Sequence, residues 1–192
     1  MTDALQQICP CIDSILEKSG VKILAIDGNS AAGKSSLASL LGKKYNCNIF
    51  HMDDFFLPQK RKTEDRLKEA GGNVDWERFK SEIIDGLFSG HSFRYRKFDC
   101  KIQALGKPVD VCPTKLNIVE GVYCMHPELF PYYDLRVFME VREEEQSNRI
   151  LLRNGSDMHK KFIDEWIPLE NYYFSKLDIR NKCSFILELK DF

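Results

Sequence analysis

A run of nine small and polar residues near the N-terminus has the composition and spacing of a phosphate-binding loop. It follows the pattern G-x-x-x-x-G-K-[ST], in which glycines let backbone N–H groups point inward at phosphate oxygens. Lys34 is expected to neutralise the β- and γ-phosphates of ATP, and the Ser35 hydroxyl to ligand a bridging Mg²⁺. The residues predicted to bind ATP are Gly28, Asn29, Ser30, Ala31, Ala32, Gly33, Lys34, Ser35 and Ser36.

Two carboxylates stand directly after apolar runs that read as buried strands. Asp53 follows Cys47–Met52, and Glu120 follows Leu116–Val119. Ligands of open α/β sheets gather at the carboxyl ends of strands, so both acids should face the phosphate loop. Asp53 is the candidate general base for an attacking hydroxyl, and Ser35, Glu120 and Asp53 are the candidate Mg²⁺ ligands. The alternative is that these acids are caps or turns at strand ends.

The neighbouring acids Asp53 and Asp54 are expected to differ in role. Consecutive side chains leaving a strand point to opposite sides, so one of the two can readily face the γ-phosphate. Asp54 is then predicted to cap a turn formed by residues 55–58.

Two arginines one helical turn apart, Arg149 and Arg153, are candidates for a closing lid over residues 149–160. Phosphoryl transfer needs cations around the equatorial oxygens, and both are therefore candidate catalytic residues. The alternative is a solvated helix face, which arginines at this spacing commonly form.

The elements that would position these groups alternate between strand and helix. Helical spacing runs over residues 4–18, 36–44, 76–87 (after a possible Asp75 cap) and 158–177. The alternation predicts an α/β protein with a three-layer P-loop NTPase fold: a mostly parallel five-stranded sheet with helices on both faces. The predicted strands are Val21–Ile26, Cys47–Met52, Leu116–Val119, Leu135–Val141 and Phe185–Leu189.

Two segments do not follow this alternation of strands and helices. Residues 93–112 alternate apolar and polar side chains around Gly106-Lys107-Pro108, which predicts an inserted β-hairpin near the substrate. The charged stretch 60–69 is interpreted as a solvated helix or a mobile loop.

Length and composition narrow the class of protein. A chain of 192 residues is expected to form one domain, with the phosphate loop at 28–36. The 28 basic and 29 acidic side chains give no basic field for nucleic acid. Seven scattered cysteines suit reduced thiols of a cytoplasmic protein, and no apolar run is long enough to cross a membrane. The expected partner is a small-molecule acceptor, and a homo-oligomer is possible.

Five motifs in this order resemble the uridine kinase branch of the P-loop kinases. That branch also includes nicotinamide riboside, pantothenate and phosphoribulose kinases, and the resemblance spans about residues 21–189. It rests on Gly28–Ser36, Met52-Asp53-Asp54-Phe55-Phe56, Asn73-Val74-Asp75-Trp76-Glu77-Arg78-Phe79, Val119-Glu120-Gly121-Val122 and Arg149-Ile150-Leu151-Leu152-Arg153.

The resemblance implies an ATP- and Mg²⁺-dependent kinase acting on a small-molecule hydroxyl, with a nucleoside such as uridine or cytidine as the favoured acceptor. By the same resemblance, Asp53 is the catalytic base, Phe56 a wall against the acceptor and Asp75 the partner of sugar hydroxyls. Tyr95 resembles a base-stacking tyrosine, and Arg149 a lid arginine.

The sequence departs from that family at two places. Asp99-Cys100-Lys101-Ile102 stands where uridine kinases carry Thr-His-Ser-Arg, and the lid lacks a later Arg-Gly-Arg. Nicotinamide riboside and pantothenate are therefore alternative acceptors. A nucleotide-dependent switch is a further alternative, although its Asn-Lys-x-Asp and Asp-x-x-Gly motifs are missing from the sequence. A ligand-binding module with structural acids is the third.

Overall fold

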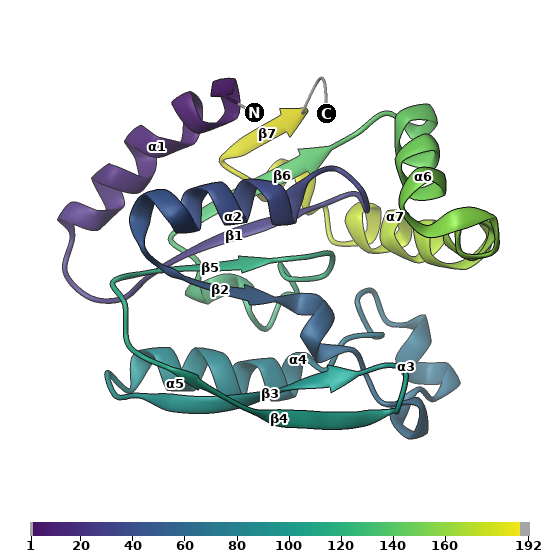
Figure 1. The fold of residues 1–192 in the computed structure, drawn as a ribbon, viewed down its shortest axis with the longest axis horizontal. Coiled ribbons are helices and arrows are strands. Elements are labelled where there is room, and N and C mark those ends of the chain that lie inside the picture. Colours follow the sequence, from purple (N-terminus) through teal and green to yellow (C-terminus); the bar gives the residue numbers. More distant parts are fainter. Residues whose placement is uncertain (1, 189–192) are drawn as a thin grey trace.

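Five parallel strands form the central sheet, in the order β2-β5-β1-β6-β7 (Figure 1). The structure is a computed structural model that describes residues 2–188. All five predicted strands are confirmed, although Leu189, the last residue of the fifth prediction, lies outside the described residues. The strands are β1 (Lys22–Gly28), β2 (Asn48–His51), β5 (Leu116–Glu120), β6 (Leu135–Glu140) and β7 (Phe185–Glu188).

The register of the sheet brings three strand ends together. Ile26 of β1 and His51 of β2 are both paired with Glu120, the last residue of β5. Because the strands run parallel, their carboxyl ends meet at one edge. In Figure 1 the arrows point toward this edge, and the helices α6 (Glu143–Lys161) and α7 (Ile167–Lys176) stand beyond it.

Helices cover both faces of the sheet because strand β1 is apolar on both sides. Ile23 and Ala25 belong to one buried cluster, which α7 and the helical segment after Asp75 complete. Leu24 and Ile26 belong to a second cluster, closed by α1 (Thr2–Glu17) and α2 (Lys34–Tyr45). A central parallel strand is buried in this way whenever both faces carry helices.

The helix predicted at 76–87 is present in three consecutive pieces. These are α4 (Trp76–Phe79), a π-helical turn (Lys80–Ile84) and α5 (Asp85–Phe88). The Asp75 side chain accepts a hydrogen bond from the Arg78 backbone N–H at 3.3 Å, so the predicted cap is confirmed.

The inserted hairpin is confirmed, but the prediction of its turn is wrong. Strands β3 (Phe93–Asp99) and β4 (Ala104–Val111) pair antiparallel, and the turn lies at residues 100–103. The Asp99 carboxylate accepts from the backbone N–H of Lys101 at 2.8 Å, which fixes the turn. Gly106 to Pro108 lie inside β4, where Pro108 is paired with Arg96.

The charged stretch 60–69 forms the short helix α3 (Glu64–Lys68), which is more than a solvated surface. Arg66 has a side chain only 16% exposed and pairs with Glu77 at 2.9 Å. It also donates to the carbonyl oxygens of Gly72 and Val74. The interpretation of this stretch as merely solvated is therefore wrong for Arg66.

The segment that carries the predicted lid is helical. Residues 149–160 fall within α6, which bends at Gly155, where φ is 78°. A π-helical turn (Phe162–Trp166) connects α6 to α7. Within residues 2–188, the structure contains no helix that combines the length and apolarity needed to span a membrane.

Candidate active site

The phosphate loop occupies the turn between β1 and α2, as its sequence pattern predicts. Gly28 has φ 134°, and a Cβ atom there would lie 1.9 Å from the Met139 carbonyl oxygen of β6. A side chain at this position would therefore force the loop away from the sheet. Gly33, with φ 95°, precedes the first residue of α2 and turns the chain into the helix.

Lys34 lies over the loop that it belongs to. Its side-chain amine donates hydrogen bonds of 2.8 Å to the carbonyl oxygens of Gly28 and Asn29, and the residue is 8% exposed. The ammonium group is thus held against the loop that is predicted to bind phosphate.

Ser35 and Glu120 are in direct contact at the carboxyl edge of the sheet. The Ser35 hydroxyl donates to Glu120 Oε1 at 3.0 Å, and the same oxygen contacts His51 Nδ1. This contact raises the pKa of His51, because the carboxylate favours the charged ring. A hydroxyl beside a carboxylate supplies the hard oxygen atoms that Mg²⁺ prefers, so the residues present fit that ion.

Asp53 lies in a short 3₁₀ turn, Met52–Phe55, which follows β2 directly. The residue is exposed at the surface. The protein around it nevertheless raises the pKa of its carboxyl group, chiefly by removing water from the carboxylate, whereas the positive charge of Lys34 lowers that pKa. The nearby charge of Glu120 raises the pKa further. A carboxylate with a raised pKa is a stronger proton acceptor than an ordinary aspartate.

The reasoning that separated Asp53 from Asp54 by strand alternation is wrong, because β2 ends at His51 and both acids lie on the 3₁₀ turn. They nevertheless differ in their neighbours. Asp54 pairs with Lys97 of the hairpin at 2.9 Å, a contact that takes the place of the predicted cap at residues 55–58.

A groove of about 500 Å³ runs between this 3₁₀ turn and the tip of the hairpin. Asp53, Asp54 and Phe56 line one side, and Lys97 and Phe98 line the other. The structure therefore brings the predicted base and the predicted acceptor wall into one concave surface. Its further lining residues are Asp99, Cys100, Lys101, Gly106 and Lys107.

Asp75 and Tyr95 are not among the described residues that line this groove. Asp75 is 3% exposed and pairs with Arg61 Nη1 at 2.7 Å. Tyr95 is 5% exposed, and its ring stacks on Phe55 at 5.8 Å between centroids. To bind an acceptor as predicted, Asp75 would have to give up its contact with Arg61, and Tyr95 would have to give up its stacking on Phe55.

The two predicted lid arginines lie in different surroundings. Arg149 Nη1 donates to the Ala31 carbonyl oxygen of the phosphate loop at 3.2 Å, and its Nε donates to Glu145. Arg153 is exposed and donates to Asn154 at 2.8 Å. The structure therefore brings Arg149 to the loop and leaves Arg153 at the surface.

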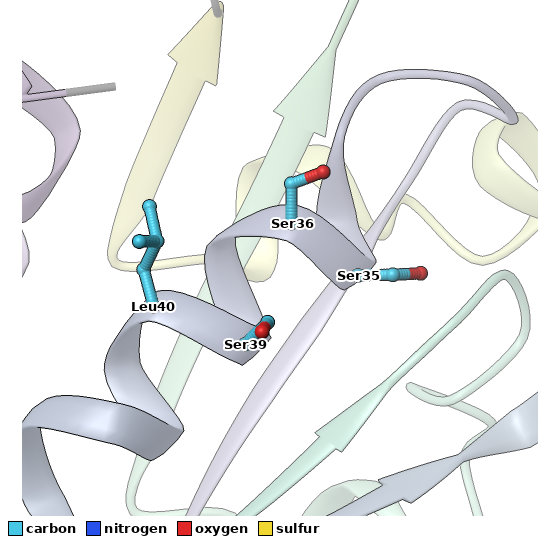
Figure 2. Close-up of a pocket in the computed structure, with 4 residues that line it drawn as sticks. All are labelled: Ser35, Ser36, Ser39 and Leu40. Atoms are coloured by element: carbon cyan, nitrogen blue, oxygen red, sulfur yellow. The ribbon is translucent and has the colours of Figure 1, made fainter.

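A second, shallow cleft of about 460 Å³ lies along the first turns of α2. Ser35, Ser36, Ser39 and Leu40 line it, and Figure 2 shows Ser36 and Leu40 on one side of the helix while Ser35 points elsewhere. Because Ser35 and Ser36 also end the phosphate loop, this cleft adjoins the predicted ATP site.

Several residues of the site were missed by sequence reasoning. His51 could have been found, since it ends the same strand that leads to Asp53. No sequence pattern indicated Lys97 or Arg61. Lys97 contacts Asp54, and Arg61 contacts Asp75, only because separate segments pack together. Glu170 contacts the loop residue Ser30 across 140 positions of sequence.

Solved structures with a similar fold carry kinase descriptions. A possible uridine kinase from Bacillus stearothermophilus covers 97% of this chain and 98% of its own length, at 20% identity and a TM-score of 0.75. A protein described as a fructose transport system kinase from Silicibacter sp. covers 88% and 91%, at 19% identity and a TM-score of 0.67. D-glycerate 3-kinase from Cryptococcus neoformans covers 86% and 87%, at 14% identity and a TM-score of 0.58.

The chain therefore has the fold of a P-loop kinase. The resemblance drawn from the five motifs and the predicted fold class are both confirmed at this level. At these identities the likeness concerns the fold, and it leaves the acceptor open. No protein-family model matches the chain.

Proposed function

We propose that this protein is an ATP- and Mg²⁺-dependent kinase that phosphorylates a hydroxyl of a small molecule, with a nucleoside of the uridine or cytidine type as acceptor. The observation that carries the proposal is the meeting of three features at one sheet edge. These are the phosphate loop, the Ser35–Glu120 pair and the carboxylate of Asp53, which lines the adjoining groove. A loop alone would fit many nucleotide-binding proteins, whereas a proton-accepting carboxylate beside it suits transfer to a hydroxyl.

The donor nucleotide would bind with its phosphates inside the loop. Backbone N–H groups and the amino end of α2 favour anions there, and Lys34 adds a full positive charge. The cleft lined by Ser36, Ser39 and Leu40 offers room for the nucleoside part of ATP next to the loop.

Ser35, Glu120 and Asp53 would hold Mg²⁺. When bound, the ion supplies positive charge that neutralises oxygens of the β- and γ-phosphates. The Ser35–Glu120 hydrogen bond keeps two of these groups together.

Asp53 would accept the proton of the acceptor hydroxyl. As the acceptor oxygen bonds to the γ-phosphorus, the bond from that phosphorus to the bridging oxygen breaks, and ADP leaves with the electron pair. The nearby Lys34 and Arg149 would stabilise the charge on the transferring group, and Arg153 would join them if the part of α6 that carries it moved toward the loop.

The groove beside Asp53 is the proposed acceptor site. Phe56 supplies an apolar wall, and the hairpin supplies the opposite side. Asp75 would hold sugar hydroxyls after exchanging its contact with Arg61, and Tyr95 would stack on the base after rearranging at Phe55.

Nicotinamide riboside and pantothenate are the alternative acceptors, since the hairpin tip differs from that of uridine kinases at residues 99–102. A nucleotide-dependent switch or a binding module would leave Asp53 without a chemical role.

The test is ATP consumption with and without a pool of nucleosides, vitamins and sugars, followed by mass spectrometry for the gain of one phosphate. We expect ADP to form in step with one phosphorylated acceptor. ATP hydrolysis that ignores every acceptor would favour a switch, and nucleotide binding without turnover would favour a binding module.

A further inference from the structure

Helix α7 reaches the middle of the phosphate loop through a buried carboxylate. Glu170 is 4% exposed and accepts a hydrogen bond from the Ser30 backbone N–H at 3.0 Å. Its other carboxylate oxygen accepts a hydrogen bond from the Ser30 hydroxyl. Burial raises the pKa of Glu170 by desolvation, and the hydrogen bonds from Ser30 oppose the shift because they favour the ionised carboxylate.

Helix α6 holds the same part of the loop through two further hydrogen bonds. Gln146 Nε2 donates to the Ser30 carbonyl oxygen at 3.1 Å, and Arg149 Nη1 donates to the Ala31 carbonyl oxygen at 3.2 Å. The N–H, hydroxyl and carbonyl groups of Ser30 are therefore all bound by α6 and α7.

The loop needs such support because of the backbone at Ala31. This residue has φ 61°, in the left-handed region that non-glycine residues rarely adopt. A residue held there is strained and persists only where its surroundings fix it. The contacts of Glu170 and Gln146 with the preceding residue supply that constraint.

We propose that Glu170 is a positioning residue for the nucleotide, which holds the phosphate loop through Ser30 in the shape that receives a polyphosphate. The inference rests on the proposed function, because it takes a nucleoside di- or triphosphate as the ligand. A loop that is ordered before binding does not lose conformational entropy on binding, so its affinity is higher than that of a loop that must first be ordered.

If Glu170 instead blocked the phosphate site, the effect of its removal would have the opposite sign. If Glu170 merely occupied a Ser30 N–H that a phosphate needs, the carboxylate would repel the ligand, and its removal would tighten nucleotide binding. The sign of the change in affinity therefore separates a support from a block.

The experiment is titration of the full chain with ADP by calorimetry, beside thermal midpoints of each variant. Glu170→Ala should weaken ADP binding roughly tenfold, because both hydrogen bonds to Ser30 are lost. Glu170→Gln should stay close to wild type, since its carbonyl can accept from the Ser30 N–H and its amide can donate to the hydroxyl. The matched control is Glu165→Ala, which removes an exposed glutamate five residues earlier.

A double-mutant cycle tests whether Glu170 acts through Ser30. Ser30→Ala removes the hydroxyl contact alone, so it should weaken ADP binding by less than Glu170→Ala does. The double variant should bind ADP as Glu170→Ala does, because the same contact is lost in both. Should Glu170→Ala fail to fold, Glu170→Asp takes its place, since the shorter side chain cannot reach both Ser30 donors.

The outcomes separate the two proposals. Unchanged or tighter ADP binding in folded Glu170→Ala, or additive losses in the cycle, would overturn the positioning role while wild-type binding upholds the nucleotide site. Wild-type protein that binds no ADP would overturn the proposed function, and the positioning role with it.

Discussion

The Ser35 hydroxyl donates a 3.0 Å hydrogen bond to Glu120 Oε1, joining the first turn of α2 to the end of β5 across 85 positions of sequence. The same oxygen contacts His51, so two groups share one carboxylate oxygen. A divalent cation at this place would take over the oxygen that both now share. The contact therefore links the phosphate loop to the proposed metal site.

Glu120→Gln should raise the Mg²⁺ concentration needed for half-maximal activity by about tenfold or more, because a neutral amide is a poorer ligand for a hard cation. The measurement is initial rate against free Mg²⁺ at saturating ATP. Glu144→Gln, at an exposed site at the start of α6, is the control and should leave the curve unchanged. An unaltered curve for Glu120→Gln would move this role to another acid.

Lys34→Ala should leave a folded protein whose kcat falls by roughly 10²–10³-fold, the cost of removing one preorganised group that stabilises developing charge. The lysine amine donates to two carbonyl oxygens of the loop, and the residue belongs to neither core cluster, so the core should stay intact. Circular dichroism and kcat should be compared with Lys43→Ala, which alters an exposed lysine of the same helix. Normal turnover in folded Lys34→Ala would contradict the assignment of the loop.

Asp53→Asn should lower kcat by roughly 10²–10⁴-fold, the usual range for a lost general base, while ADP still binds. Asp54→Asn should affect turnover less. It removes the negative charge that pairs with Lys97, whose side chain is 48% exposed, so the loss of stability should be within about 1 kcal/mol. If Asp54→Asn proved the more damaging to turnover, the choice of base would be wrong.

The raised pKa of Asp53 also predicts how stability changes with pH. The folded protein binds a proton at Asp53 more tightly than the unfolded chain, whose pKa is near 3.8. The contribution of Asp53 to the free energy of unfolding is therefore lost as pH rises from 3.8 through the pKa of the folded state. Asp53→Asn should be more stable relative to wild type at pH 7 than at pH 3.5, as urea denaturation at both values would show. A constant difference would argue against a raised pKa.

Asp75→Asn should weaken acceptor binding much more than ATP binding, if the carboxylate holds acceptor hydroxyls. Asparagine is as good an N-cap as aspartate, so α4 should still begin at Trp76. Asp75→Ala, in contrast, would lose the cap and about 1 kcal/mol of stability. KM for the identified acceptor and for ATP are the two measurements. Equal rises in both would show that Asp75 acts only through the fold, by way of Arg61 and Arg78.

The phosphate loop and the parallel sheet could be predicted from sequence because their causes are local. An apolar run between Val21 and Ile26, followed by Gly28 and Gly33, dictates a buried strand and a curled loop whatever lies elsewhere. The end of β2 could not be placed in the same way. Met52 and Phe55 are apolar and buried in either a strand or a 3₁₀ turn, so their types do not distinguish the two.

The remaining errors have a different physical origin. The hairpin turn depends on one carboxylate, Asp99, which binds the backbone ahead of it, whereas the Gly106–Pro108 sequence only looks like a turn. The contact of Glu170 with Ser30 depends on how α7 packs over the loop, and no periodic pattern in the chain records it.

The last prediction concerns Tyr173, whose hydroxyl donates to Asp27 Oδ2 at 2.8 Å beneath the phosphate loop. Both residues are fully buried, and Asp27 also accepts from the backbone N–H groups of Gly28 and Met125. Burial raises the pKa of Asp27, and the Tyr173 hydrogen bond is among the contacts that oppose this shift. Tyr173→Phe should therefore cost about 1–3 kcal/mol and raise that pKa further.

The expected loss depends on pH in a definite direction. With its pKa raised further, Asp27 of the folded variant holds a proton over a wider range than in wild type, so the variant loses more stability as pH rises. The difference in unfolding free energy between Tyr173→Phe and wild type should thus be larger at pH 7.5 than at pH 4.5, measured by urea denaturation. Tyr172→Phe, at a neighbouring residue that is 43% exposed, should change little at either pH. An equal loss at both values would mean that the hydroxyl does not stabilise the ionised form of Asp27.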